Sequence, residues 1–421
     1  MFLLELKKSA VLSDSETESG AAWSAPGAPP SARVPSSGGG PPGGSDREPS
    51  RAVDPISSYK NLRKNYHLMV GPGVGPPTDS FYIQDLTVLR NVYHEWTSAL
   101  PHVTPYYAVK CNPDPEIVDR LATLGSNFDC ASPAEIQQVL DLGVGPERIL
   151  YANPCKRFQD IVFAKEMKIS RTTFDSVCEL KKMARAGWCP ELLLRIRADD
   201  PKARCNLGVK YGAEEHDWDI LLFTARAHGF KVVGVSFHVG SFATTPGVFS
   251  AGVCKAERAI DLAREHGYAP HIIDIGGGFS ASHGLPKEPI KTGYTLIAEP
   301  GRFFVERVST LHTPVIGTKG SGVTIDESLY GAFNCILFDH AAPQPTRVLR
   351  GGRAILTETV PMTIFGSTCD GGDLIAKEAL LPANIEEGDV IVWENMGAYT
   401  SAATTQFNGF PFNNRKKIYI E

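Results

Sequence analysis

Eight short apolar segments alternate with segments of helical character between residues 104 and 302, and this repetition restricts the fold more than any other feature of the chain. Strands that alternate with helices form parallel sheets through right-handed crossovers. Eight such strands predict a TIM barrel, whose functional site lies at the C-terminal ends of the strands. The strand candidates are residues 104–110, 126–132, 148–154, 171–176, 191–197, 232–240, 271–278 and 295–302.

The helical segments between these strands carry start and stop signals. Residues 132–143 begin with Ser132 and Glu135, the two members of a capping box, with a proline at the first helical position. Residues 176–187 repeat the capping box, and both segments end at a glycine, the residue preferred just after a helix. We therefore predict a helix over each range.

The chain outside the barrel divides into three parts. Residues 1–54 are rich in Ser, Gly, Pro and Ala and cannot bury enough apolar surface to become ordered, so we predict a disordered low-complexity tail. Residues 55–89 lead into the barrel and contain a strand candidate, 80–89, that we expect to join a later sheet. We place the barrel at 90–308 and a C-terminal β domain, a sandwich or open barrel, at 309–421. The β-rich segments predicted there are residues 310–320, 331–340, 353–367 and 389–399.

Composition excludes several classes of protein. The 421 residues carry a net charge of −5, which gives no sign of affinity for nucleic acid or anionic membranes. The nine cysteines are dispersed and form no CxxC pair, as is typical of a reducing compartment. No apolar run approaches the roughly 20 residues that span a bilayer, and the N-terminus matches no secretory signal. We predict a cytoplasmic protein without a metal site.

Polar residues stand at the predicted strand ends, and one of them is a lysine. Lys110 ends the first strand candidate and suits Schiff-base chemistry, because neighbouring groups or burial can lower the pKa of its amine. After the seventh strand candidate, a run of glycines lets backbone N–H groups surround a phosphate. The glycines are Gly276, Gly277 and Gly278.

The eighth strand candidate ends in an acid and an arginine. Arg302 can bind a phosphate through two hydrogen bonds, and the loops after strands seven and eight of a TIM barrel often form a phosphate site. Glu299 can bind the nitrogen of a heterocycle. A lysine, a phosphate site and an acidic partner together point to pyridoxal phosphate.

Ten segments resemble the fold-type III, alanine-racemase-like decarboxylases that act on ornithine, lysine, arginine or diaminopimelate. The resemblance covers about residues 80–412 in the family's order and is densest with the branch that acts on L-ornithine in eukaryotes. It implies a barrel that binds pyridoxal 5'-phosphate, followed by a β-sandwich or β-barrel domain. The matching segments are PYYAVKCN, FDCAS, YANPCK, TFDS, GVSFHVGS, DIGGGF, AEPGRFF, YGAFNCILFDH, TCDGGDLI and ENMGAYT.

The resemblance implies decarboxylation of L-ornithine to putrescine and CO2, the first step of polyamine biosynthesis. Lys110 would carry the cofactor, Glu299 would keep its ring nitrogen protonated, and His238 would stack on the ring. Cys369 would return a proton to the substrate carbon as a general acid. The cofactor-binding residues would be Lys110, Asp129, Arg195, His238, Ser241, Gly276, Gly277, Gly278, Glu299, Pro300, Gly301, Arg302 and Tyr399.

The resemblance also implies a way to recognise the substrate and a quaternary structure. Asp339 and Asp370, with Tyr330, would bind the distal ammonium of a diamino acid, since carboxylates select a cation. In the family the segment with Cys369 reaches the site of the other subunit, which implies a homodimer with shared active sites. An antizyme-like regulator is a further possible partner. The matched interface positions are Lys210, Asp373 and Gly397.

The sequence departs from the family at two places. Residues 279–294, between the last two strand candidates, contain two prolines and no apolar helical period, although a parallel crossover usually contains a helix of about 11 residues. We expect the helix to be missing and apolar surface to be uncovered on the barrel wall. A deletion in the gene model explains this best, with a tolerated change or a damaged protein as alternatives. Phe242 stands where the family usually has glycine and would crowd the cofactor loop.

Other functions remain open. A lysine or arginine decarboxylase of the same family would share the chemistry and differ near Asp339. Diaminopimelate is disfavoured because Asp339 and Asp370 would repel its distal carboxylate. A catalytically impaired regulator, like the antizyme inhibitors, would have lost residues such as Lys110 and Glu299, which this chain retains.

Overall fold

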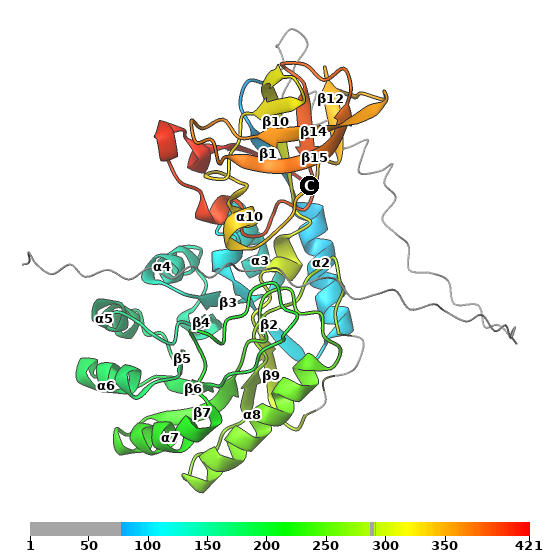
Figure 1. Ribbon diagram of the computed structural model, residues 1–421. Helices are drawn as coiled ribbons and strands as arrows, with labels where there is room; N and C mark the ends of the chain where they lie inside the picture. The colour runs from blue at the N-terminus through cyan, green and yellow to red at the C-terminus, as the bar shows by residue number, and fades with distance from the viewer. Residues whose placement is uncertain (1–76, 287–289, 291) are drawn as a thin grey trace, which may run out of the picture. The chain divides into compact units, whose positions relative to one another are not determined.

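Two sheets organise the residues that the computed structural model describes, which are 77–286, 290 and 292–421. One is a closed barrel of eight strands, and the other is a sheet of nine strands (Figure 1). These sheets confirm the predicted TIM barrel and the predicted C-terminal β domain. The tail predicted to be disordered, 1–54, lies outside the described residues, as does most of the segment that leads into the barrel.

The barrel strands pair in parallel and in chain order, and the last strand closes on the first. Helices α4 to α8 surround strands β3 to β7 (Figure 1), and a cluster of apolar side chains, including Leu150, Leu193 and Ile297, fills the interior. The elements are β2 (Val103–Ala108), α3 (Pro115–Leu124), β3 (Asn127–Cys130), α4 (Pro133–Asp141), β4 (Ile149–Tyr151), α5 (Phe158–Glu166), β5 (Arg171–Phe174), α6 (Val177–Ala186), β6 (Glu191–Arg195), α7 (Trp218–Ala227), β7 (Lys231–Ser236), α8 (Val248–Glu265), β8 (Ile272–Asp274) and β9 (Thr295–Ala298).

The predicted capping boxes determine where α4 and α6 begin. The hydroxyl oxygen of Ser132 accepts a hydrogen bond from the backbone N–H of Glu135 at 3.3 Å, and Ser176 does the same for Glu179. The carboxylate of Glu135 in turn accepts from the N–H of Ala131 at 2.6 Å. Each such cap contributes about 1 kcal/mol to the stability of its helix.

The crossover between β8 and β9 contains no helix in the residues that the structure describes. Instead, Phe279 is buried between two helices. Its ring stacks on that of Phe249 in α8 at 4.4 Å and meets the edge of Trp96 at 5.0 Å. Trp96 belongs to α2 (Leu86–Ala99), the helix that precedes the barrel.

The apolar surface expected beside this crossover is covered in the described residues. Ile273 in β8 and Leu296 in β9 are only 0% and 4% exposed. The prediction of an uncovered wall is therefore wrong, because Phe279 and the partly buried Leu285 and Tyr294 pack against the same core. These three side chains thus cover the apolar surface without a helix in the described part of the crossover.

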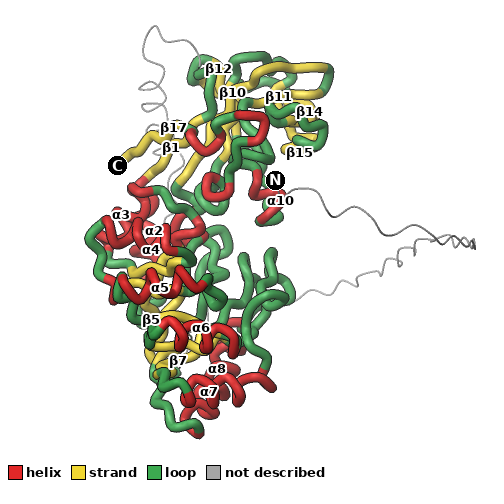
Figure 2. Tube along the Cα trace, turned by 90° about the vertical axis from the view of Figure 1, so that its left-hand side faces the viewer, coloured by secondary structure: helices red, strands yellow, loops and turns green. Residues whose placement is uncertain are grey.

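The second sheet begins with a strand from before the barrel. Strand β1 (Phe81–Asp85) pairs with β10 and with the last strand, β17, and Figure 2 shows β1 and β17 side by side. The other elements are α9 (Arg302–Val305), β10 (Ser309–Lys319), β11 (Gly322–Ile325), α10 (Asn334–Phe338), β12 (Arg347–Arg350), β13 (Arg353–Ala354), β14 (Thr359–Phe365), β15 (Leu374–Pro382), β16 (Val390–Trp393) and β17 (Lys416–Ile420).

Two predicted β segments are corrected. The strand predicted at 80–89 ends at Asp85, whose side chain accepts hydrogen bonds from the N–H groups of Thr87 and Val88 and so starts α2. Residues 331–340 contain the short helix α10 instead of a strand. Both errors come from apolar runs that are too short for periodicity to separate helix from strand.

Gly397 allows the backbone after β16 to approach the end of α9 closely. A Cβ atom at this position would overlap the carbonyl oxygen of Val305. The carbonyl oxygen of Gly397 accepts a hydrogen bond from the side-chain amide of Asn112 at 2.8 Å. This glycine therefore joins the barrel to the C-terminal sheet within one chain.

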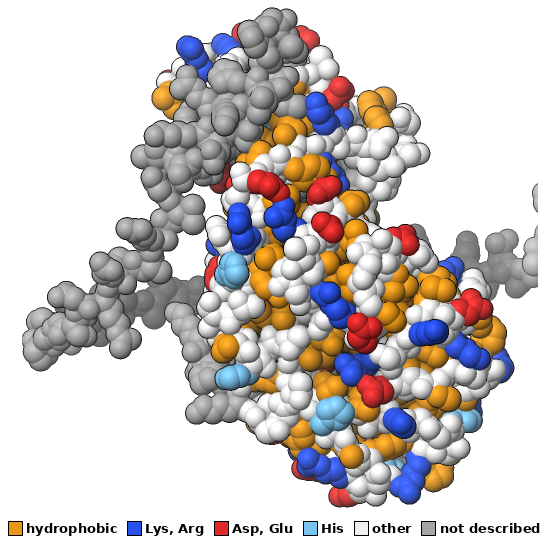
Figure 3. Space-filling view, turned by 180° about the vertical axis from the view of Figure 1, so that it is seen from behind, with side chains coloured by type: hydrophobic (Ala, Val, Ile, Leu, Met, Phe, Trp, Pro, Cys, Tyr) orange, Lys and Arg blue, Asp and Glu red, His pale blue; other side chains and the backbone are white. Residues whose placement is uncertain are grey.

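The surface mixes charges of both signs. Figure 3 shows Lys and Arg side chains interspersed with Asp and Glu side chains on one face of the molecule. None of the helices in the described part of the chain is both long and apolar enough to cross a membrane.

Candidate active site

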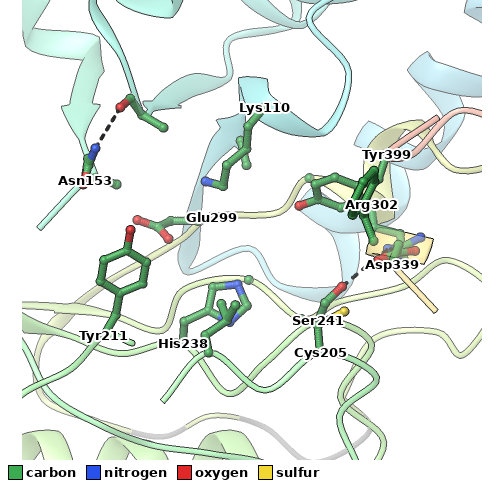
Figure 4. A pocket seen from close by; sticks show the side chains of 18 of the residues that line it. Lys110, Asn153, Cys205, Tyr211, His238, Ser241, Glu299, Arg302, Asp339 and Tyr399 are labelled. Atoms are coloured by element: carbon green, nitrogen blue, oxygen red, sulfur yellow. Dashed lines mark hydrogen bonds and ion pairs between the residues drawn. The ribbon is translucent and has the colours of Figure 1, made fainter. Parts of the chain in front are cut away.

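A cavity of about 390 Å³ opens at the C-terminal ends of the barrel strands. Its wall includes residues of the C-terminal domain, and Figure 4 shows two groups of polar side chains in it. One group surrounds Lys110 and the other surrounds Arg302. The predicted site residues that line the cavity are Lys110, Arg195, His238, Ser241, Gly277, Gly278, Glu299, Gly301, Arg302, Asp339 and Tyr399.

Lys110 lies in a short turn after β2 and forms an ion pair with Asp129, which is buried at the end of β3. Burial alone would lower the pKa of the Lys110 amine, but the carboxylates of Asp129 and Glu299 raise this pKa above its usual value. From the sequence we expected the pKa of Lys110 to be lowered, because the neighbouring carboxylates were not known. The second oxygen of Asp129, Oδ1, is buried without a hydrogen-bond partner among the described residues.

Two buried carboxyl groups share a region next to Lys110. Glu299 follows β9, and Asp274 ends β8 and accepts a hydrogen bond from the N–H of Gly276 at 2.9 Å. Burial raises the pKa of Asp274 to about 7, and the charge of Asp129 acts in the same direction. Burial and the charges of Asp274 and Asp129 raise the pKa of Glu299 well above its usual value. The pair therefore holds a proton near neutral pH.

Asp274 was missed in the sequence. An acidic residue inside the apolar segment IIDIGGG, directly before a glycine run, was the signal that could have found it. A buried carboxylate needs a partner, so such a residue at a strand end indicates a site.

His238 follows β7 by two residues and lines the cavity. Its Nδ1 atom accepts a hydrogen bond from the N–H of Gly240 at 3.0 Å, which leaves the proton on Nε2. Burial lowers the pKa of His238 to about 3, and the positive charges of Arg195 and Lys110 act in the same direction. The ring is therefore neutral, as a residue that stacks on a heterocycle should be.

The glycine run forms a tight turn beside His238. Gly278 has φ of +107°, and a Cβ atom there would lie 2.6 Å from the carbonyl oxygen of Gly240. A Cβ atom on Gly277 would lie 2.8 Å from Nε2 of His238. Side chains would fill this turn, so glycine is required for a phosphate to approach the backbone.

Arg302, the predicted phosphate ligand, is paired with Asp339, the predicted substrate ligand. Its Nη2 atom donates to both carboxylate oxygens of Asp339 at 2.6 and 2.7 Å and lies 3.4 Å from the hydroxyl oxygen of Ser241. Its Nε atom is buried without a hydrogen-bond partner in the described part of the chain. A second arginine, Arg204, donates to Asp339 at 3.1 Å.

Phe242, which was expected to crowd the cofactor loop, does not line the cavity. Its backbone has φ of +61°, in the left-handed region that costs a bulky residue roughly 1–2 kcal/mol. Its ring lies 3.8 Å below the guanidinium of Arg204 and meets the ring of His283 at 4.3 Å. The ring also lies 5.8 Å from the guanidinium of Arg302, and crowding of the cofactor loop stays a prediction.

Several predicted residues lie elsewhere. Cys369 is exposed, and so is Asp370, which accepts a hydrogen bond from the hydroxyl of Tyr330 at 2.7 Å. None of the three lines the cavity of their own chain. Three further predicted residues, Asp129, Gly276 and Pro300, are outside the set that lines it.

The predicted interface residues have different surroundings. Lys210 is exposed, whereas Asp373 is buried and accepts hydrogen bonds from groups of its own chain. Its donors are the hydroxyl of Ser328 at 2.8 Å, the N–H of Leu329 at 2.8 Å and the hydroxyl of Thr368 at 2.6 Å. The surroundings of Asp373 therefore indicate an anchor of its own loop, and contact with a partner stays a prediction.

The long connection between β6 and α7 supplies cavity residues that were not predicted. Cys205, Leu207 and Tyr211 line the cavity, and the guanidinium of Arg195 lies 5.1 Å from the Tyr211 ring. No motif marks these positions, because their placement depends on how the loop folds.

The comparisons with known proteins agree with this site. Residues 86–306 match the family model described as pyridoxal-dependent decarboxylase, pyridoxal binding domain. The chain therefore belongs to the pyridoxal-dependent decarboxylases.

Named relatives narrow the similarity within this family. The chain is 41% identical over 353 residues to the chloroplastic ornithine decarboxylase of Nicotiana glauca, covering 78% of this chain and 81% of that one. It is 41% identical over 376 residues to ornithine decarboxylase of Mus musculus, covering 81% and 80%. Among solved structures, the arginine decarboxylase of Paramecium bursaria Chlorella virus bound to agmatine has a TM-score of 0.76 and 36% identity, covering 82% and 98%.

The cavity fits pyridoxal phosphate on its own geometry. The glycine turn leaves room for a phosphate, the Nε atom of Arg302 has an unused donor, and Lys110 is near the protonated Glu299–Asp274 pair. These groups match the three parts of the cofactor that a protein must hold. The glycine turn and Arg302 match the phosphate, Lys110 matches the aldehyde carbon, and the carboxyl pair matches the ring nitrogen.

Proposed function

We propose that the chain decarboxylates L-ornithine to putrescine and CO2 with pyridoxal 5'-phosphate. The observation that carries this proposal is one cavity with Lys110 in one group and the carboxylate of Asp339 in the other. The names of the curated relatives support ornithine as the substrate. A diamino acid has a cation at its far end, which a buried carboxylate binds well.

Each group of residues has a proposed role. Lys110 would bond the cofactor, the Glu299–Asp274 pair would keep a proton at the ring nitrogen, and neutral His238 would cover the ring face. The glycine turn, Ser241 and Arg302 hold the phosphate. The bound cofactor supplies a sink for the electrons that remain when CO2 departs.

The chain is proposed to act as a homodimer with shared sites. Cys369 and Asp370 are exposed and lie outside their own cavity, where a general acid and a second carboxylate are still needed. Two apolar residues of α10 are exposed beside the cavity, Leu337 at 51% and Phe338 at 69%. Exposed apolar side chains of this kind support the proposal that a second chain covers this surface. An antizyme-like regulator and a cytoplasmic location stay predictions of the resemblance.

CO2 release by the purified, cofactor-loaded protein tests the reaction. Ornithine, lysine and arginine are compared at equal concentrations, and we expect release mainly from ornithine. Release mainly from arginine would favour the function named for the viral structure, and release from none would favour a regulatory protein.

Subunit mixing tests the shared site. A Lys110→Arg chain and a Cys369→Ala chain are each expected to be inactive or weak as homodimers. After mixing, half of the mixed sites would contain both intact residues, so activity should return. Failure to return, with mixed dimers detected, would place both residues in one chain's site.

A further inference from the structure

Four side chains form a connected cluster at the edge of the cavity: Arg204, Phe242, Asp339 and Arg302. Both arginines donate to the one carboxylate of Asp339, Arg302 at 2.6 and 2.7 Å and Arg204 at 3.1 Å. Arg302 lines the cavity, whereas Arg204 does not. Arg204 thus contacts Asp339 without being part of the cavity wall.

Backbone pairing keeps Arg204 and Phe242 together. The N–H of Arg204 donates to the carbonyl oxygen of Ser241 at 2.9 Å, and the N–H of Ser241 donates to Cys205 at 3.0 Å. These bonds form a bridge between two loops that each carry one of the two side chains. The guanidinium carbon of Arg204 therefore lies over the Phe242 ring, 3.8 Å from its centre, and such a contact suits arginine better than lysine.

The two arginines differ in what else they can bind. Arg302 is beside Ser241 and has an unused Nε donor, so a phosphate at the glycine turn would draw on its hydrogen bonds. Arg204 packs on Phe242 and does not line the cavity, so a phosphate in the cavity would not compete with Asp339 for its hydrogen bonds. Asp339 would therefore keep Arg204 as a partner if Arg302 gave up its hydrogen bonds to bind a phosphate.

Resting on the proposed function, we propose that Arg204, seated on Phe242, is a positioning residue that orients Asp339 toward the distal ammonium of the substrate while Arg302 binds the cofactor's phosphate. The assignment deepens the proposed site and adds two residues that lie outside the cavity wall.

An opposite role, in which Arg204 repels the ammonium, is weaker on physical grounds. The side chain of Arg204 is 23% exposed, so water and salt screen its charge over distance, whereas Asp339 is 8% exposed and feels the direct hydrogen bond. With a phosphate dianion present, the phosphate and Asp339 together carry about three negative charges, against two positive charges on the arginines. The cluster as a whole therefore attracts a cation.

The main test replaces Arg204 by a residue of similar length without charge. Arg204→Met should raise KM for ornithine about tenfold and change kcat less than about threefold, because orientation of the ammonium and not the chemistry is lost. Cofactor affinity, titrated by absorbance, should stay unchanged. Arg258→Met is the matched control, since Arg258 is exposed, pairs with Glu215 and does not line the cavity.

Conservative variants test the contact between Arg204 and Phe242. Arg204→Lys keeps the charge but loses the guanidinium over the Phe242 ring. It should therefore raise KM for ornithine less than Arg204→Met does. Phe242→Leu keeps a large residue at the same backbone angle and should raise KM less than Arg204→Met. The double variant should resemble Arg204→Met alone, because both changes disrupt one contact; additive effects would remove Phe242 from the proposal.

A binding measurement separates this inference from the proposed reaction. Calorimetry with putrescine and the cofactor-loaded protein should show Kd raised by the same factor in Arg204→Met. A wild-type protein that binds putrescine but releases no CO2 would sink the proposed reaction and still test Arg204. An unchanged or lower KM and Kd in folded Arg204→Met, or no putrescine binding by the wild type, would overturn the role of Arg204.

Discussion

The barrel and the C-terminal sheet both bury titratable side chains, and the pKa shifts in the two regions are similar in size. Burial lowers the pKa of His238 in the barrel and of His312 in the sheet to about 3. It raises the pKa of Asp274 and of Glu327 to about 7. The difference is where these groups point: His238 lines the cavity, whereas His312 stacks on Phe81 at 4.7 Å inside a core.

The comparison teaches that a shifted pKa marks burial, and that topology decides whether the group is available for chemistry. Parallel strands in a closed barrel bring all their C-terminal ends to one opening, so polar residues at those ends face each other. The C-terminal sheet is mixed, and its strands run in both directions. Among the described residues, it reaches the cavity through residues outside its strands, such as Asp339 and Tyr399.

The largest expected effect tests the barrel half of this comparison. Lys110→Arg keeps a cation beside Asp129 but removes the amine that can bond the cofactor. We expect CO2 release to fall by roughly 10⁴-fold or more, with little change in thermal unfolding. A variant that retains more than a small fraction of the activity would show that Lys110 does not carry the cofactor.

The next effect compares the two cores. Phe279→Ala should cost about 3–5 kcal/mol of unfolding free energy, because a buried ring between Phe249 and Trp96 is lost. Leu381→Ala in the sheet should cost about 2–5 kcal/mol. Denaturant unfolding measures both. Only Phe279→Ala should also weaken cofactor binding, since Phe279 lines the cavity; equal weakening in both would contradict the distinction.

The junction between the regions gives a smaller effect. Gly397→Ala places a methyl group on the carbonyl oxygen of Val305 and should destabilise the protein by about 1–3 kcal/mol. Gly317→Ala is the control, because nothing lies within 4 Å of its Cβ position. Thermal unfolding should separate the two, and equal melting temperatures would show that the junction adapts to the added methyl.

The smallest effect concerns pH and the sheet histidine. His312 has a folded pKa of about 3 and an unfolded pKa of about 6.5, so the unfolded chain binds more protons between these values. Its neutral form therefore contributes stability above about pH 6.5, and this is lost as pH falls toward about 3. His312→Phe should reduce the slope of stability against pH in this window by up to about 1.4 kcal/mol per pH unit. An unchanged slope would mean that His312 does not take up a proton on unfolding.

Much of the fold followed from local patterns in the sequence. The alternation of strands with helices and the capping boxes at Ser132 and Ser176 predicted the barrel, because these signals depend on neighbours in the chain. Short apolar runs such as 331–340 were misjudged, since α10 contains only five residues. The closure of the last crossover by Phe279 depends on contacts with Phe249 and Trp96, which no local pattern encodes.

Most site residues at the strand ends were predicted, although Asp274 at the end of β8 was missed, and the cavity residues of the connection between β6 and α7 were missed as well. Strand ends gave Lys110, His238 and Glu299, whereas Tyr211 and Cys205 lie in a long connection whose path the sequence does not show. The pairing of Arg302 with Asp339 was also hidden, because the two residues are 37 positions apart in the chain. Resemblance could name both residues, but only coordinates show that they bind each other.

The anchoring of Asp373 has a consequence for how two chains would assemble. Its buried carboxylate accepts hydrogen bonds from Ser328, Leu329 and Thr368, so it fixes the ends of the short segment that carries Cys369 and Asp370. A segment that is already rigid loses little conformational entropy when it docks. In the proposed dimer, association should therefore proceed as a simple bimolecular collision, at roughly 10⁵–10⁷ M⁻¹s⁻¹, without a slow ordering step after the encounter.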